Sequence, residues 1–203
     1  MPSKSDYEKL LNLPTIKAFL DTIAWAEGGT YNKLFGGGTF TGNQHPRRFV
    51  KAGGYTSDAA GRYQFLYSSW KLTANQIGLE DFSPQNQDIG ALHEIYKRGE
   101  LEKIKRGDLL GTLKGLGCLW AALPYSGCKQ REKSYTATKN YYDSRLKYYG
   151  ANPNVTANNN VVSNANKPKQ VIDKLFNDIK ADTTAQYIGL GFGVLALIVI
   201  LRR

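Results

Sequence analysis

The 203-residue chain has few of the side chains that bind transition metals, with only two cysteines and two histidines. A structural zinc site normally collects four such ligands at short spacings. His45 and His93 lie far apart in the sequence and in no ligand pattern. We therefore expect no metal site and no cofactor.

The two cysteines leave a question about covalent structure. Cys118 and Cys128 bracket a short segment. If the protein works outside a reducing compartment, they can form a disulfide that closes a small loop, whereas a reducing compartment would keep two free thiols. The sequence leaves both states open.

The sequence also lacks an export signal and a basic stripe. The segment from Met1 to Leu13 carries charges throughout and has no apolar core, so it does not predict a signal peptide. The net charge is +10, but lysine and arginine are scattered among acidic residues. Binding to nucleic acid normally needs a concentrated basic surface, so we expect no nucleic-acid partner. Anionic wall polymers or lipids would attract such a surface equally well.

Composition divides the chain into parts. Residues 1–150 mix aromatic, aliphatic and charged positions and can bury a core. Residues 151–169 are rich in asparagine and lack aromatic residues, so we expect a linker. Residues 170–182 have apolar side chains at helical spacing, which predicts an amphipathic juxtamembrane helix. This helix would either lie at a membrane interface or continue the following segment into water.

Residues 183–201 contain no charged side chain. As a helix they would span about 28 Å, close to the thickness of a bilayer core. They also lack the polar stripe that a buried helix of a globular domain normally shows. The segment therefore predicts a separate C-terminal transmembrane helix in contact with membrane lipid. Arg202 and Arg203 favour a cytoplasmic or equivalent interior position for the C-terminus.

A helix with an acidic residue at its end is predicted near the N-terminus. Apolar residues recur at helical spacing, with Pro14 in the first turn and Gly28 and Gly29 at the end; these apolar residues are Ile16, Phe19, Leu20, Ile23 and Ala24. Glu27 falls on the apolar face, where loss of water favours the protonated form that a general acid needs. Periodicity alone favours a glutamate at the helix end that turns to solvent or pairs with an arginine.

Several segments in a fixed order resemble the bacteriophage lambda-type endolysin family, in the lysozyme-like superfamily. They are Lys17–Gly28, Phe40-Thr41, His45–Arg47, Ala60–Gln64, Trp70, Gly78-Leu79, Asp81–Pro84, Gln87-Asp88, Arg98-Gly99, Arg106–Asp108 and Leu119–Pro124. The resemblance implies a mainly α (α+β), lysozyme-like fold with a small β element around Gly36 to Tyr55. It also implies that Glu27 is the catalytic acid.

The resemblance further implies a lytic transglycosylase. Such an enzyme cleaves the β-1,4 bond between N-acetylmuramic acid and N-acetylglucosamine in peptidoglycan and leaves 1,6-anhydromuramic ends. A phage would use it for wall penetration or host lysis. With the predicted anchor, the expected localisation is a single-pass membrane protein in a virion internal membrane or the host inner membrane, with the catalytic domain facing the cell wall.

Two alternatives remain from the sequence. One is a hydrolytic muramidase, which needs a second carboxyl group; Asp21 and Asp58 are candidates, and nothing singles out either. The other is a non-enzymatic wall-binding membrane protein.

Candidate residues for binding the glycan lie in two segments. In the first, Arg62, Tyr63 and Gln64 follow a glycine that would let the backbone approach a ligand; the tyrosine ring could stack on a sugar, and the glutamine amide could bond N-acetyl groups. In the second, Tyr125 and Ser126 belong to a loop that the resemblance places opposite Glu27. The early tyrosine and the late Cys128 depart from the family pattern, so the contacts of this loop do not carry over.

Overall fold

The main helices begin and end where their sequences provide caps. In a computed structural model, which describes residues 1–153, α2 (Pro14–Glu27) and α4 (Pro84–Lys97) each begin with proline, whose missing N–H costs nothing at a first turn. α7 (Tyr135–Tyr148) begins after Ser134, whose hydroxyl accepts a hydrogen bond from the Ala137 N–H. The predicted helix with Glu27 at its end is therefore present with the expected bounds.

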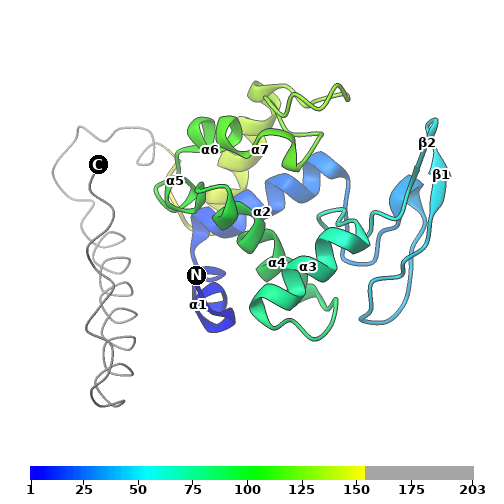
Figure 1. Cartoon of the computed structure of the whole chain (residues 1–203). Helices are drawn as coiled ribbons and strands as arrows, with labels where there is room; N and C mark the ends of the chain where they lie inside the picture. Colours follow the sequence, from blue (N-terminus) through cyan, green and yellow to red (C-terminus); the bar gives the residue numbers. More distant parts are fainter. Residues whose placement is uncertain (154–203) are drawn as a thin grey trace, which may run out of the picture. The chain divides into compact units, whose positions relative to one another are not determined.

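The other helices are shorter; α1 precedes α2, and the rest lie in sequence between the three main helices (Figure 1). They are α1 (Lys4–Leu10), α3 (Tyr67–Ile77), α5 (Leu101–Lys105) and α6 (Leu109–Leu116), with 3-10 turns η1 (Phe35–Gly37) and η2 (Gly117–Leu119).

The small sheet is one antiparallel hairpin. β1 (Val50–Ala52) pairs with β2 (Tyr55–Ser57), with Val50 opposite Ser57. Gly53 and Gly54 both have positive φ, 55° and 83°, as a two-residue hairpin turn of the favoured hand requires. A small β element was predicted around Gly36 to Tyr55. The paired strands lie at the end of that range and extend beyond it, because the two glycines set the position of the turn.

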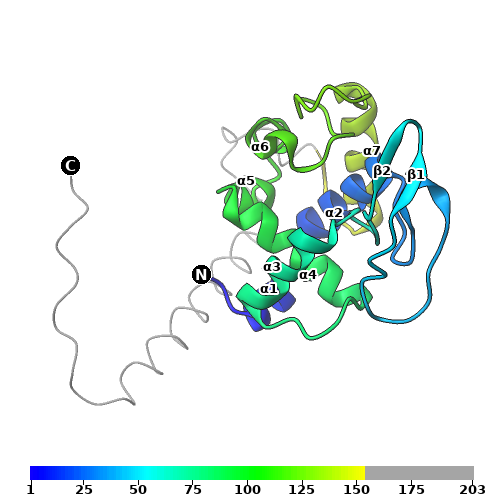
Figure 2. The ribbon, with the colours of Figure 1, turned by 45° about the vertical axis from the view of Figure 1, so that its right-hand side comes forward.

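The core forms around α2, which lies in the middle of the helical body in both views (Figures 1 and 2). Its predicted apolar residues Ile16, Phe19, Leu20 and Ile23 are buried. α7 packs along it, and the rings of Phe19 and Tyr142 meet edge to face at 6.4 Å between centroids. This packing holds α2 rigidly, so the residue at its end has a well-defined position.

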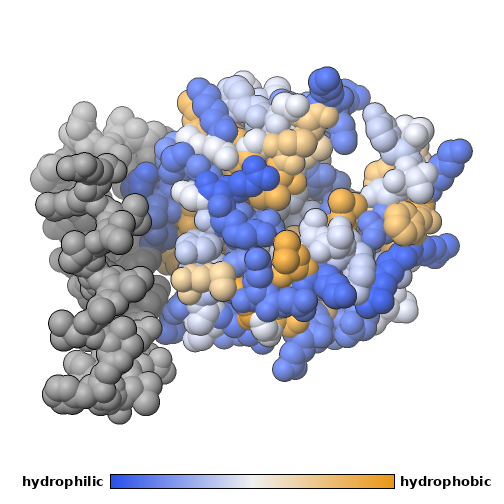
Figure 3. Space-filling view, viewed as in Figure 1, coloured by the Kyte–Doolittle hydropathy of each residue, from blue (hydrophilic) through white to orange (hydrophobic). Residues whose placement is uncertain are grey.

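The surface has a notch beside the end of α2. The face in Figure 3 is mostly hydrophilic, with small separate apolar patches, and the notch opens between the β1–β2 hairpin and the rest of the domain. In the same view of the ribbon, α2 runs with its C-terminal end toward the hairpin (Figure 1). The notch is therefore the natural place to look for a functional site.

Some predictions fall on residues that the structure does not describe. Most of the expected linker (151–169), the juxtamembrane helix (170–182) and the transmembrane helix (183–201) lie outside residues 1–153. Within residues 1–153, no helix is long and apolar enough to cross a membrane.

Candidate active site

Glu27 is the last residue of α2, and the two glycines after it shape the backbone around its carboxyl group. Gly28 ends the helix in the left-handed conformation, with φ 64°. Gly29 lies against the next segment so closely that a Cβ atom there would be 2.1 Å from the carbonyl oxygen of Arg62. The chain can therefore turn away directly after Glu27, and the Ala60–Gln64 segment lies beside it.

The Glu27 carboxyl group is partly buried and has little compensation for its charge. Among residues 1–153 it receives one hydrogen bond, from the Ala122 N–H to Oε1 at 3.1 Å. Burial raises the pKa of Glu27 above its ordinary value, and the hydrogen bond from Ala122 offsets only part of this rise. These are the surroundings that keep a carboxyl group protonated and able to act as a general acid.

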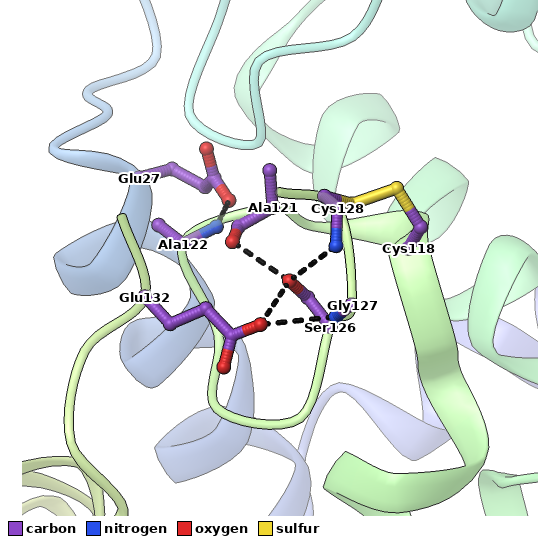
Figure 4. Close-up of a disulfide and its surroundings, with 8 residues drawn as sticks. All are labelled: Glu27, Cys118, Ala121, Ala122, Ser126, Gly127, Cys128 and Glu132. Atoms are coloured by element: carbon purple, nitrogen blue, oxygen red, sulfur yellow. Dashed lines mark hydrogen bonds between the residues drawn. A yellow bond between two sulfur atoms is a disulfide. The ribbon is translucent and has the colours of Figure 1, made fainter. Parts of the chain in front are cut away.

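Ala122 belongs to a loop that is closed by a disulfide (Figure 4). Cys118 and Cys128 are bonded, with their Cα atoms 5.2 Å apart, which resolves the alternative that the sequence left open. The loop is also fixed on its inner side, because Trp120 Nε1–H donates to the Tyr63 carbonyl oxygen at 3.1 Å. Beyond the disulfide, the Lys133 N–H donates to the Ala122 carbonyl oxygen at 2.8 Å. The N–H and the carbonyl oxygen of Ala122 therefore each form a hydrogen bond.

Glu132 also lies in this region, and no local pattern in the sequence indicated it. Its carboxylate accepts hydrogen bonds from the N–H groups of Tyr125 and Gly127, each at 2.9 Å. A carboxylate oxygen is 2.9 Å from Oγ of Ser126, which is equally close to the Ala121 carbonyl oxygen. These donors lower the pKa of Glu132. Glu132 therefore holds the loop in place in its ionised form, as a carboxylate.

Behind the site, Arg62 is the centre of a network of buried polar groups. Its guanidinium forms ion pairs with Asp21 of α2 and Asp88 of α4. It also donates to the hydroxyls of Tyr31 at 2.9 Å and Tyr63 at 3.1 Å. Because buried charges need partners, this network fixes the Ala60–Gln64 segment against two helices.

Three of the four acceptors around Arg62, namely Tyr31, Tyr63 and Asp88, also interact with one another. The Tyr63 hydroxyl donates to Asp88 at 2.5 Å, and the Tyr31 hydroxyl lies 2.9 Å from the other oxygen of the same carboxylate. Burial raises the pKa of Asp88, and the hydrogen bonds from Tyr63 and the charge of Arg62 oppose that rise. Burial and the neighbouring Asp88 raise the pKa of Tyr31 to about 12.

The predicted glycan-binding residues do not all reach the surface. The Tyr63 ring is 1 % exposed, so it packs in the core and has no open face for a sugar. Arg62 is engaged in its network, and Ser126 is buried within the disulfide loop. Gln64 is half-buried, with its amide N–H₂ donating to the Gly61 carbonyl oxygen at 2.9 Å. Tyr125, 45 % exposed, is the aromatic residue among these five that presents a ring to solvent.

The structure adds exposed aromatic residues that sequence reasoning did not select. Phe49, immediately before β1, and Tyr55, in β2, are 71 % and 62 % exposed. Phe49 and Leu66 line a shallow hollow with Arg47 and Asp58. Their signal in the sequence was weak, because an aromatic residue in a strand usually packs into a core.

The two carboxyl groups considered as a second catalytic acid or base have structural roles. Asp21 accepts from Arg145 Nε at 2.6 Å and from the Tyr149 hydroxyl at 2.8 Å, in addition to its ion pair with Arg62. Asp58 accepts a hydrogen bond from the Tyr67 N–H, at the start of α3, at 3.3 Å. In residues 1–153 there is also no group of three histidine, cysteine or acidic side chains that could hold a metal ion.

Comparisons with known proteins show the family of the chain. The family model for endolysins matches residues 17–149. The endolysin of Escherichia phage lambda is 41% identical over 128 residues, which cover 57% of this chain and 81% of that protein. The endolysin of Escherichia phage P2 is 39% identical over 89 residues, covering 44% of this chain and 54% of that protein.

Solved structures give the same answer for the fold. The lysozyme of bacteriophage lambda, complexed with a chitohexasaccharide, superposes with a TM-score of 0.61 at 36% identity and covers 68% of this chain and 96% of that one. A second structure of lysozyme from bacteriophage lambda gives a TM-score of 0.57 at 34% identity, with the same coverage. Fold and site together define a lysozyme-like enzyme. The chain belongs to the endolysin family, the phage enzymes that degrade peptidoglycan in host lysis.

The comparisons also correct one prediction. The expected localisation, a single-pass membrane protein in a virion internal membrane or the host inner membrane, is wrong. The relatives that match are endolysins of phages lambda and P2, and none of the helices within residues 1–153 could cross a membrane. The apolar run on which the prediction rested, residues 183–201, lies outside the described part of the chain.

Proposed function

We propose that this endolysin is a lytic transglycosylase that cleaves the β-1,4 bond between N-acetylmuramic acid and N-acetylglucosamine, with Glu27 as its single catalytic acid and base. The observation that carries the proposal is the contrast between Glu27 and the other carboxyl groups near it. Glu27 is partly buried, has one N–H donor and has a raised pKa. Asp21 and Glu132 have their oxygens occupied by several donors each.

The reaction needs one group that first gives and then takes a proton. Protonated Glu27 donates to the oxygen that bridges the two sugars, and the bond from that oxygen to the muramic anomeric carbon breaks. The muramic C6 hydroxyl then attacks the anomeric carbon and gives its proton to the Glu27 carboxylate. The product is a 1,6-anhydromuramic end, no water is consumed, and Glu27 returns to its starting state. A second carboxylate that activates water is not required.

The surroundings of Glu27 suit both halves of this cycle. Burial favours the protonated form before cleavage, and the Ala122 N–H stabilises the carboxylate formed afterwards. A group with a pKa raised toward the working pH exchanges protons in either direction at small cost. The same hydrogen bond also fixes the direction in which the carboxyl group points.

Glycan binding is proposed for the walls of the notch. Sugar rings pack well on exposed aromatic faces, and Tyr125 on the disulfide loop and Phe49 and Tyr55 on the hairpin offer such faces. Gln64 belongs to the segment that approaches Gly29 through Arg62, and it brings an amide suited to N-acetyl groups. Arg62, Tyr63 and Ser126 support these walls from within. The lysozyme of phage lambda in complex with a chitohexasaccharide supports a glycan ligand for this fold.

Mass spectrometry of the products tests the chemistry. The full chain is incubated with purified peptidoglycan alongside two matched variants, Glu27→Gln and the exposed control Glu80→Gln. We expect anhydromuramic ends, lighter by one water than reducing ends, from the unaltered chain and from Glu80→Gln, and no cleavage by Glu27→Gln. Reducing ends would instead assign a hydrolytic muramidase, which needs a second carboxyl group. Cleavage by Glu27→Gln would remove Glu27 from the mechanism.

A further inference from the structure

The loop that carries Ala122 is joined covalently at both ends. Cys118 follows α6, Cys128 follows the turn at Tyr125, and the disulfide brings their backbones together with 5.2 Å between Cα atoms. Figure 4 shows Glu27 pointing toward the Ala122 backbone within this closed loop, with the disulfide on the loop's other side. The bond is thus directly connected to the segment that contacts the proposed catalytic acid.

The first half of the loop is anchored by the body of the domain, and the second half is held by hydrogen bonds within the loop region and by the disulfide. Trp120 is buried and donates to the Tyr63 carbonyl oxygen, which anchors the first half. From Tyr125 onward, the disulfide and the hydrogen bonds to Glu132, which is itself exposed, are joined by two weaker contacts. The Ser126 hydroxyl donates to the Ala121 carbonyl oxygen at 2.9 Å, and the Tyr125 ring lies 6.1 Å from that of Tyr135. Of all these contacts, the disulfide is the covalent one. Ala122 lies between these two halves.

The second half also has an unfavourable backbone conformation. Tyr125 has φ 64° and Lys129 has φ 57°, in the left-handed region that residues with a Cβ atom rarely adopt. Such conformations persist only where surrounding structure enforces them. Here the disulfide at Cys128, which lies between these two residues, enforces the conformation together with the hydrogen bonds to Glu132. Without the bond, the backbone is expected to relax and to shift the Ala122 N–H.

We propose that the Cys118–Cys128 disulfide is a redox-sensitive positioning element: when formed, it holds the Ala122 N–H at Glu27, and when reduced, it releases the loop and lowers activity. This inference rests on the proposed role of Glu27. Reduction by a dithiol breaks the S–S bond, transfers two electrons and two protons to give two thiols, and converts the dithiol into its own disulfide. Oxidation by a disulfide-bearing oxidant reverses the exchange.

The consequence is a link between activity and compartment. Thiols persist in reducing compartments and disulfides in oxidising ones. The enzyme is therefore less active where the loop is open and becomes fully active where an oxidant closes it.

The experiment uses the full chain in four states. They are the oxidised protein, the same protein reduced with dithiothreitol, the Cys118→Ser/Cys128→Ser variant, and a core control, Ile77→Val, which lowers stability away from the loop. Thiol content is verified by alkylation and mass. The readouts are kcat on peptidoglycan, the pH dependence of kcat and the Tm of each protein.

We expect the reduced protein and the serine variant to have kcat lower by about tenfold, because small displacements of a catalytic group have large effects on rate. We also expect the alkaline limb of the pH profile to move to lower pH. Opening the loop hydrates Glu27 and removes the Ala122 hydrogen bond; burial is the larger of the two influences, so the pKa of Glu27 falls toward its ordinary value. Dithiothreitol should not affect the serine variant, and reoxidation should restore the unaltered chain.

Two results would overturn the inference. One is an unchanged kcat after complete reduction. The other is a loss of kcat with an unmoved alkaline limb, matched by Ile77→Val at equal loss of Tm, which would make the disulfide a general stabiliser only. The Glu27→Gln variant separates this failure from that of the proposed function. If Glu27→Gln is inactive while the reduced enzyme keeps full activity, the proposed role of Glu27 stands and the proposed role of the disulfide fails.

Discussion

Replacing Glu27 by glutamine should make the protein more stable at neutral pH. Burial raises the pKa of Glu27, so the folded state holds this proton more tightly than the unfolded state. As pH rises above the unfolded pKa, the unfolded chain ionises first, which lowers its free energy relative to that of the folded protein. This loss of stability is complete once pH exceeds the folded pKa, and it is absent at acid pH, where both states are protonated.

The size of the effect follows from the contacts of the carboxyl group. Its charge is compensated by one backbone N–H donor, and glutamine keeps the shape and an oxygen that can accept the same bond. We expect a gain of about 1 kcal/mol in the free energy of unfolding at neutral pH, in the range found when groups held for activity are replaced. For a chain of this size that corresponds to a rise in Tm of about 3 °C.

Thermal unfolding of the unaltered chain and of Glu27→Gln, measured across a pH series, checks this expectation. The difference in Tm should be near zero in acid, grow as pH rises, and then become constant. The control Glu80→Gln changes an exposed residue and should show no such growth. A Glu27→Gln protein that is no more stable than the unaltered chain at neutral pH would refute the idea that Glu27 is held at a cost to stability.

Three further substitutions test the surroundings of the site. Arg62→Met leaves two carboxylates without their shared partner and should lower the free energy of unfolding by about 3 kcal/mol in guanidinium denaturation, with exposed Arg106→Met near zero. Gly29→Ala places a Cβ atom 2.1 Å from a carbonyl oxygen and should lower the free energy of unfolding by about 2 kcal/mol. Gly28→Ala meets no atom within 4 Å and should lower it by about 1 kcal/mol, for its positive φ alone. Equal losses in the two variants would contradict the close approach of Gly29 to Arg62. Tyr125→Ala should raise KM for glycan about threefold through loss of an aromatic face, leaving kcat unchanged; a fall in kcat alone would place the ring elsewhere.

Local patterns were sufficient for the helix that carries Glu27. Its bounds followed from the spacing of Ile16 to Ile23, from Pro14 and from the glycine pair, because each of these signals acts within one or two turns. The resemblance identified the order of the remaining segments, and the family and the mainly helical fold are confirmed by the comparisons.

Contacts between distant segments were beyond the reach of local patterns. The sequence predicted that the Tyr63 ring would be exposed and could stack on a sugar, because its neighbours are glycine and polar residues. It is buried because its hydroxyl meets Asp88, 25 residues later, and Arg62. The role of Glu132 has the same origin, since its partners are backbone N–H groups of a folded loop, which no residue type in the sequence signals.

Carboxyl groups of similar intrinsic acidity have different roles in this region because their surroundings differ. Asp21 and Glu27 belong to the same helix, α2, yet they face different partners. Asp21 is enclosed by two guanidinium groups and a tyrosine hydroxyl, so its oxygens have no room for a proton shared with a substrate. Among residues 1–153, Glu27 accepts one hydrogen bond, from the Ala122 N–H, and it lies at the end of the helix, where a Cβ atom on Gly28 would meet no atom within 4 Å. Because a proton donor must be able to lose and regain its proton during each cycle, the surroundings of Glu27 suit the catalytic role proposed for it, whereas those of Asp21 stabilise the helix that carries both residues.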